Sequence, residues 1–120
     1  MSHIMSIETK IREPAALAAA CQRLNLPVPV QGTAKLFAGE ATGLIVQLRG
    51  WEYPAVIDVA SGNIQFDHFE GRWGDPAQLD RFLQAYSVEL TKAEARKKGF
   101  QVSEQALESG SIKLKIVTGD

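Results

Sequence analysis

The chain has 120 residues, 45% of them hydrophobic and 22% charged, and a formal net charge of -1. This composition predicts one globular domain over residues 1–120, and it excludes long disorder and a molecule that is basic throughout. Cys21 is the only cysteine, so it cannot form an internal disulfide. No apolar run reaches the ~18 residues of a membrane helix, and the N-terminus lacks a basic region followed by an apolar stretch. We therefore expect a cytoplasmic protein.

Alternation and a proline predict the first strand and the first helix. Apolar or small residues alternate with polar ones over residues 4–11, which indicates a strand. Pro14 suits the first position of a helix, where its missing N–H is not needed, and Asn25 suits a left-handed stop. The helix carries one apolar stripe, made of Leu17, Ala20, Cys21 and Leu24. Cys21 is therefore interpreted as a core residue and not as a nucleophile.

The middle of the chain is predicted to hold short antiparallel strands. Pro27 and Pro29 keep the chain extended before the first of them. Ser61, Gly62 and Asn63 are typical of a hairpin turn between the last two. The predicted segments are a weak one at 34–36 and stronger ones at 42–48, 55–59 and 64–68.

The strongest helix signal begins at Asp75. Asp75 can cap the helix, Pro76 suits its first position, and Gln78 can reach back as the reciprocal partner. Cations occupy its last turn, and Gly99 ends it. Its apolar face is made of Leu79, Phe82, Leu83, Tyr86, Leu90 and Ala93.

Two alternating runs around a polar turn at 108–111 predict a C-terminal hairpin. Strand runs separated by two helices predict a single α+β domain. Its expected architecture is a mainly antiparallel sheet with both helices packed on one face, in the order β-α-β-β-β-β-α-β-β. We expect the face that bears Ile112, Leu114 and Ile116 to be covered by Leu79, Phe82, Tyr86 and Leu90.

Both ends of the chain carry short motifs that resemble one family. At the N-terminus these are Met1-Ser2-His3 and Ile7-Glu8-Thr9-Lys10-Ile11-Arg12; at the C-terminus they are residues 98–105, KGFQVSEQ, and residues 110–114, GSIKL. The chain is similar to the hypothetical chloroplast open reading frame 35 family, also called domain of unknown function 1257. Residues 56–67 are shorter and less aromatic than the family pattern. The resemblance implies a fold group and no catalytic residue.

One candidate site is acidic. Asp67, His68 and Glu70 could ligate a divalent metal or serve as an acid and a base. Neighbours on a strand point to opposite faces, so of these residues only His68 and Glu70 would converge. The competing interpretation is a polar strand end that leads into the capped helix.

Two further candidate surfaces suit binding. The basic one could bind phosphates, although acidic residues are interleaved with it; it consists of Arg96 and Lys97 at the helix end and Lys113 and Lys115 on the last strand. Aromatic residues in glycine-framed loops suit recognition of a protein or ligand, or serve as local hydrophobic lids. These aromatic residues are Trp51, Tyr53 and Trp73.

No catalytic motif can be read from the sequence, so we expect no catalysis and no cofactor. Lys113 and Lys115 are typical of an edge strand that resists aggregation, and a partner can extend such an edge. The favoured interpretation is a non-catalytic protein-interaction or adapter module whose partner is another protein or a second copy, with neither a membrane nor nucleic acid expected as a partner. Two alternatives stay open: weak nucleic-acid binding through the basic helix end, and a metal-dependent hydrolase around Asp67 and His68.

Overall fold

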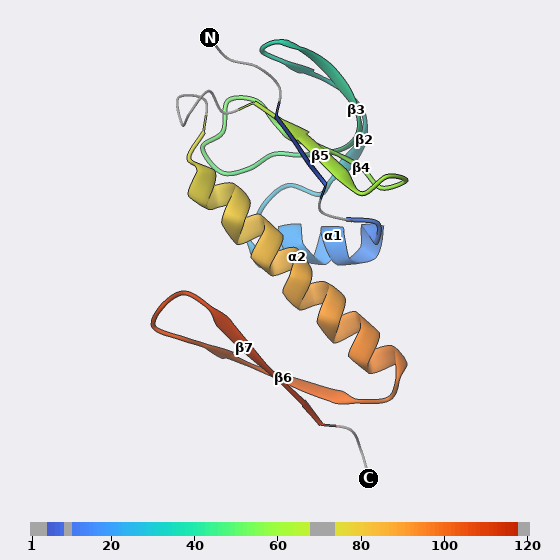
Figure 1. Ribbon diagram of the computed structural model, residues 1–120, viewed down its shortest axis with the longest axis vertical. Helices are drawn as coiled ribbons and strands as arrows, with labels where there is room; N and C mark the ends of the chain where they lie inside the picture. The colour runs from blue at the N-terminus through green and yellow to red at the C-terminus, as the bar shows by residue number, and fades with distance from the viewer. Residues whose placement is uncertain (1–4, 9–10, 68–73, 118–120) are drawn as a thin grey trace.

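The computed structural model describes residues 5–8, 11–67 and 74–117 (Figure 1). The elements in chain order are β1 (Met5–Glu8), α1 (Pro14–Arg23), β2 (Val30–Leu36), β3 (Gly39–Val46), β4 (Ala55–Asp58), β5 (Asn63–Phe66), α2 (Pro76–Lys97), β6 (Gln101–Ala106) and β7 (Ile112–Val117). This is the predicted order of an α+β domain, and every strand pair among the described residues is antiparallel.

The strands form two separate sheets. Five of them make one sheet in the order β1-β5-β4-β3-β2, while β6 and β7 form a second sheet in which no other described strand takes part. The predicted hairpin between β4 and β5 is confirmed, because Gly62 N donates to the Asp58 carbonyl at 2.7 Å and Asp58 pairs with Asn63. The longer β2–β3 hairpin extends past β4 and β5 and curves away at its tip (Figure 1).

Local signals set the ends of both helices as the sequence predicts. Pro14 occupies the first turn of α1, and Asn25 follows its end with a φ of 58°. Asp75 caps α2 by accepting a hydrogen bond from Ala77 N at 3.0 Å. Gly99 follows the end of α2 with a φ of 78°, a left-handed conformation that glycine adopts without steric cost.

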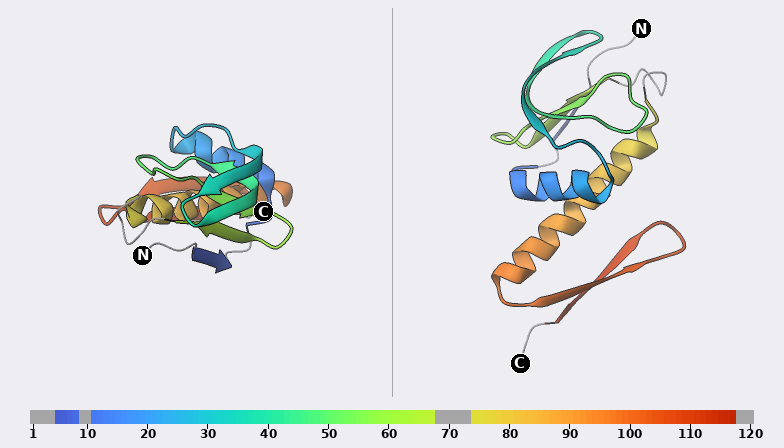
Figure 2. Two further views of the ribbon diagram at one scale, coloured as in Figure 1. Left: turned by 90° about the horizontal axis from the view of Figure 1, so that it is seen from above. Right: turned by 180° about the vertical axis from the view of Figure 1, so that it is seen from behind.

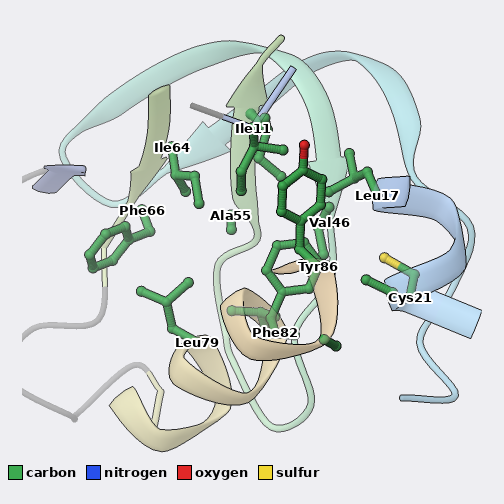
Figure 3. Packing of buried hydrophobic residues seen from close by; sticks show 14 of the residues in the cluster. Ile11, Leu17, Cys21, Val46, Ala55, Ile64, Phe66, Leu79, Phe82 and Tyr86 are labelled. Atoms are coloured by element: carbon green, nitrogen blue, oxygen red, sulfur yellow. The ribbon is translucent and has the colours of Figure 1, made fainter. Parts of the chain in front are cut away.

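The main core lies where α1 and α2 cover one face of the five-stranded sheet (Figure 3). The buried side chains from the sheet include Val46, Ala55, Ile57, Ile64 and Phe66, and those from the helices include Leu17, Cys21, Leu79, Phe82 and Tyr86. The Tyr86 hydroxyl accepts hydrogen bonds from the backbone N–H groups of Arg12 and Glu13, both at 3.3 Å. These bonds hold the start of α1 against α2.

Helix α2 has a second buried face, on the side away from this core. Val88 and Ala95 are each 5% exposed, and neither belongs to the core cluster under the five-stranded sheet. They lie roughly half a helical turn from Phe82 and Tyr86 around the helix axis. Both β6 and β7 contact α2, and Figures 1 and 2 show the hairpin and the large sheet on opposite sides of this helix.

The packing predicted for β7 is therefore wrong. Leu79, Phe82 and Tyr86 are in the core under the five-stranded sheet and do not cover β7. The reason is that α2 carries two buried stripes, and the weaker one, with Val88 and Ala95, receives the hairpin.

Because one helix joins two sheets on opposite sides, the molecule is elongated. Its principal extents are 55 × 32 × 22 Å, and its Cα radius of gyration is 15.3 Å. A compact domain of this length has a radius of gyration of about 13.6 Å. Among the described residues, no helix is both long and apolar enough to span a membrane.

Candidate functional site

The β6–β7 hairpin is the candidate site, and its turn defines which way its backbone groups point. Gly110 N donates to Leu107 O at 3.0 Å, and Leu107 N donates to Ser111 O at 2.9 Å. With Gly110 at a φ of 91°, this is a type I turn followed by a glycine bulge. The local sequence Glu-Ser-Gly-Ser suits it, because glycine fills the left-handed position.

That turn sets the alternation of the antiparallel ladder. Since Leu107 and Ser111 share a hydrogen bond, the next pair, Ala106 and Ile112, is not hydrogen-bonded, and hydrogen-bonded and non-bonded pairs alternate from there. The backbone N–H and C=O groups of Ile112, Leu114 and Ile116 therefore point away from β6. No other described strand pairs with them, so they form a row of open donors and acceptors along the outer edge of β7.

Side chains divide the hairpin into two faces. The face toward α2 carries Val102, Glu104 and Ala106 from β6 and Ile112, Leu114 and Ile116 from β7. The opposite face is polar and exposed, and it includes Ser103, Gln105, Lys113 and Lys115. At the far end of β7, Ile116 is 44% exposed and Val117 is 46% exposed. An apolar strand end thus adjoins an open strand edge.

Glu104 ties the hairpin to both helices. Its Oε2 atom lies 2.6 Å from Arg23 Nη2 of α1 and 2.5 Å from Lys92 Nζ of α2, and Arg23 also contacts Glu89 at 3.3 Å. Hydrogen bonds from Arg23 and Lys92 lower the pKa of Glu104 from 4.5 to about 2. In the sequence, Glu104 is only one of the acidic residues that are interleaved with the basic surface. Only the long-range packing of β6 identifies its role.

The basic residues singled out from the sequence do not gather on one patch. Arg96 and Lys97 are exposed in the last turn of α2. Lys113 and Lys115 lie on the hairpin face that points away from α2. Lys113 and Lys115 therefore point away from the helix that carries Arg96 and Lys97, and all four residues are exposed.

The aromatic residues have different environments. Trp51 is 4% exposed, its indole Nε1 donates to Asp75 O at 2.9 Å, and its ring lies 5.9 Å from that of Phe66. Trp51 packs in the main core, so its burial fits the second interpretation of the aromatic loops, a local hydrophobic lid. Tyr53 is half-buried and contacts the exposed Phe37 ring edge-on at 6.3 Å. Trp73 lies outside the described residues.

The acidic candidate is represented by Asp67 alone, since His68 and Glu70 lie outside the described residues. Asp67 is fully buried, and neither of its carboxylate oxygens has a hydrogen-bond partner among the described residues. Over residues 5–8, 11–67 and 74–117, no three side chains of His, Cys, Asp or Glu form a group that could hold a metal ion.

Cys21 is buried in the main core, as the sequence predicts. Burial raises the pKa of its thiol to about 11. Because the thiolate is the nucleophilic form, the side chain is unreactive near neutral pH.

Comparison with known proteins adds no relative to this description: no family model matches the chain, and no curated protein or solved structure matches it.

Proposed function

We propose that the protein is a non-catalytic interaction module that accepts a strand of a partner protein along the outer edge of β7. The observation that carries the proposal is the open row of backbone groups at Ile112, Leu114 and Ile116, next to exposed apolar residues at the end of the strand. Two-stranded sheets are marginally stable alone, so a third strand would satisfy these groups and extend a small sheet.

The partner is inferred to be a different protein that carries acidic residues on the added strand. A second copy could add its own β7 antiparallel to this edge, with the polar faces of the two hairpins on the same side. Lysine would then lie opposite lysine, for example Lys113 opposite Lys115 of the second copy. Like charges directly opposite each other destabilise a strand pair, whereas opposite charges stabilise it. Acidic residues at alternate positions of the added strand would match Lys113 and Lys115.

The proposal includes two further expectations from the sequence. One is a cytoplasmic location, which the single unpaired Cys21 supports because stapled folds are typical of secreted domains. The other is membership of the chloroplast open reading frame 35 family, supported by the motifs at both ends of the chain. Neither expectation adds a catalytic residue.

The test uses a proline at a position where only the outward N–H is lost. In Ile116→Pro the missing donor points away from β6, and the side chain it replaces is 44% exposed. Ile116→Ala is the matched control, because it shortens the side chain and keeps the N–H. We expect tagged wild-type protein and Ile116→Ala to retain the same partner from the native cell, and Ile116→Pro to lose it.

Hydrogen exchange gives the second measurement. In the complex, the amides of Ile112, Leu114 and Ile116 should exchange more slowly than in the free protein, while those of Lys113 and Lys115, already bonded to β6, change little. Retention of the partner by Ile116→Pro, or unchanged exchange at the three outward amides, would refute strand addition at this edge.

A further inference from the structure

A second surface feature lies away from the hairpin edge, between the end of α1 and the start of α2. It is a pocket of about 380 Å³, at the small end of the range for ligand sites. Its lining residues are Arg23, Leu24, Asn25, Leu26, Leu48, Arg49, Gln78 and Arg81. Three arginines and two amides thus surround one hollow, and none of its lining residues is acidic.

The arginines differ in how much of their charge is already matched. Arg23 is paired with Glu89 and Glu104. Arg49 Nη2 donates to the Leu24 carbonyl at 2.8 Å, which positions its guanidinium without neutralising it. Among the described residues, neither Arg49 nor Arg81 forms a salt bridge. The pocket therefore holds two guanidinium groups with unmatched positive charge.

We infer that this pocket binds a small organic phosphate monoester. Two unmatched guanidiniums favour a dianion, and the planar fork of arginine matches the oxygens of phosphate. Asn25 and Gln78 supply neutral hydrogen-bond donors beside them.

The remaining wall argues for an organic group on the phosphate. Leu24 and Leu26 are partly buried and line the pocket next to Arg49. The volume is far larger than a phosphate ion needs, so an apolar ring or short chain can lie against these leucines while the phosphate meets the guanidiniums.

Calorimetric titration of the full chain with phenyl phosphate, inorganic phosphate and benzoate at fixed ionic strength tests the inference. We expect phenyl phosphate to bind more tightly than inorganic phosphate, because only it uses the apolar wall, and more tightly than the monoanion benzoate. Arg81→Gln should weaken phenyl phosphate binding by about 10-fold or more, since it removes charged hydrogen bonds. The affinity of Arg81→Lys for phenyl phosphate should lie between those of the wild type and Arg81→Gln, because lysine keeps the charge but lacks the planar guanidinium group.

Arg96→Gln is the matched control, because Arg96 is an exposed arginine of the same helix and does not line this pocket. It should leave the affinity for phenyl phosphate unchanged. Arg81 makes no salt bridge among the described residues, so Arg81→Gln should fold normally, and its melting temperature verifies this. Equal loss in Arg81→Gln and Arg96→Gln, benzoate binding as tight as phenyl phosphate, or no heat at millimolar phenyl phosphate would overturn the inference.

Discussion

Two glycines that face each other across β2 and β3 allow a sharp test of how closely the large sheet is packed. Gly32 and Gly43 are register partners, so they occupy equivalent places in one hairpin. A Cβ at Gly43 would lie 2.4 Å from Ile57 O and 2.9 Å from Ile57 C, both backbone atoms of β4. A Cβ at Gly32 would meet Ile45 Cδ1 at 3.5 Å, an ordinary contact. Alanine should therefore be tolerated at Gly32 and not at Gly43.

The cost at Gly43 follows from this geometry. A carbon approaches a carbonyl oxygen to about 3.3 Å, so Gly43→Ala requires β3 and β4 to separate locally by about 0.9 Å. A ladder hydrogen bond of about 2.9 Å stretched by that amount falls outside bonding distance. One or two lost bonds together with the overpacking of the sheet give a destabilisation of about 3 kcal/mol. No side-chain rotation can relieve a clash with backbone.

Urea denaturation followed by circular dichroism measures both variants against wild type. Gly43→Ala should lower the free energy of unfolding by about 3 kcal/mol and the melting temperature by roughly 10 °C. Gly32→Ala should stay within about 0.5 kcal/mol of wild type or gain slightly, because alanine restricts the unfolded chain. If Gly43→Ala unfolds within about 0.5 kcal/mol of wild type, the close approach of β3 and β4 is not as described.

Two further predictions concern charges. Hydrogen bonds from Arg23 and Lys92 lower the folded-state pKa of Glu104 from 4.5 to about 2, so the stability that Glu104 contributes is present above pH 4.5 and is lost as the pH falls to 2. Glu104→Gln should lower the free energy of unfolding by no more than about 1 kcal/mol at pH 7. When stability is measured as a function of pH, the wild type and the variant should converge near pH 2. Asp67→Asn should raise the free energy of unfolding at neutral pH by about 1 kcal/mol, because it replaces a buried carboxyl group that has no hydrogen-bond partner among the described residues. A lower midpoint in urea for Asp67→Asn would contradict this prediction. A melting temperature that rises with Mn²⁺ in the wild type and not in the variant would support the hydrolase alternative.

The features that the sequence predicted correctly depend on local chemistry. Asp75 caps α2 by accepting a hydrogen bond from Ala77 N, two residues later. Asn25 adopts the left-handed conformation after α1, and Gly62 closes the β4–β5 hairpin. Each of these signals acts within a few residues. The order of strands and helices could be predicted from these signals, because residues close in sequence determine where a helix or strand begins and ends.

The features that the sequence did not predict depend on residues far apart in the chain. Trp51 sits in a glycine-framed loop that looks exposed, yet its indole bonds the backbone of Asp75, 24 residues away. Val88 and Ala95 form a second buried stripe of α2. It is hard to recognise in the sequence because the other face of the helix carries more and larger apolar residues. The arginine pocket is assembled from the end of α1, the loop after β3 at Leu48 and Arg49, and the start of α2, and no local pattern brings these segments together.

The second face of α2 also explains why the hairpin offers an edge instead of a packing surface. Its apolar side is used against Val88 and Ala95, and the Gln84 amide, which donates to Gly110 O at 3.1 Å, holds the turn in place. The other side carries lysines and neutral polar residues, so a helix or a second sheet has no apolar surface to cover there. Among the described residues, no strand pairs with the outer edge of either β6 or β7, and the β7 edge is the one that adjoins exposed apolar residues at its strand end. A partner that makes backbone hydrogen bonds, namely an added strand, is therefore the one that this hairpin suits.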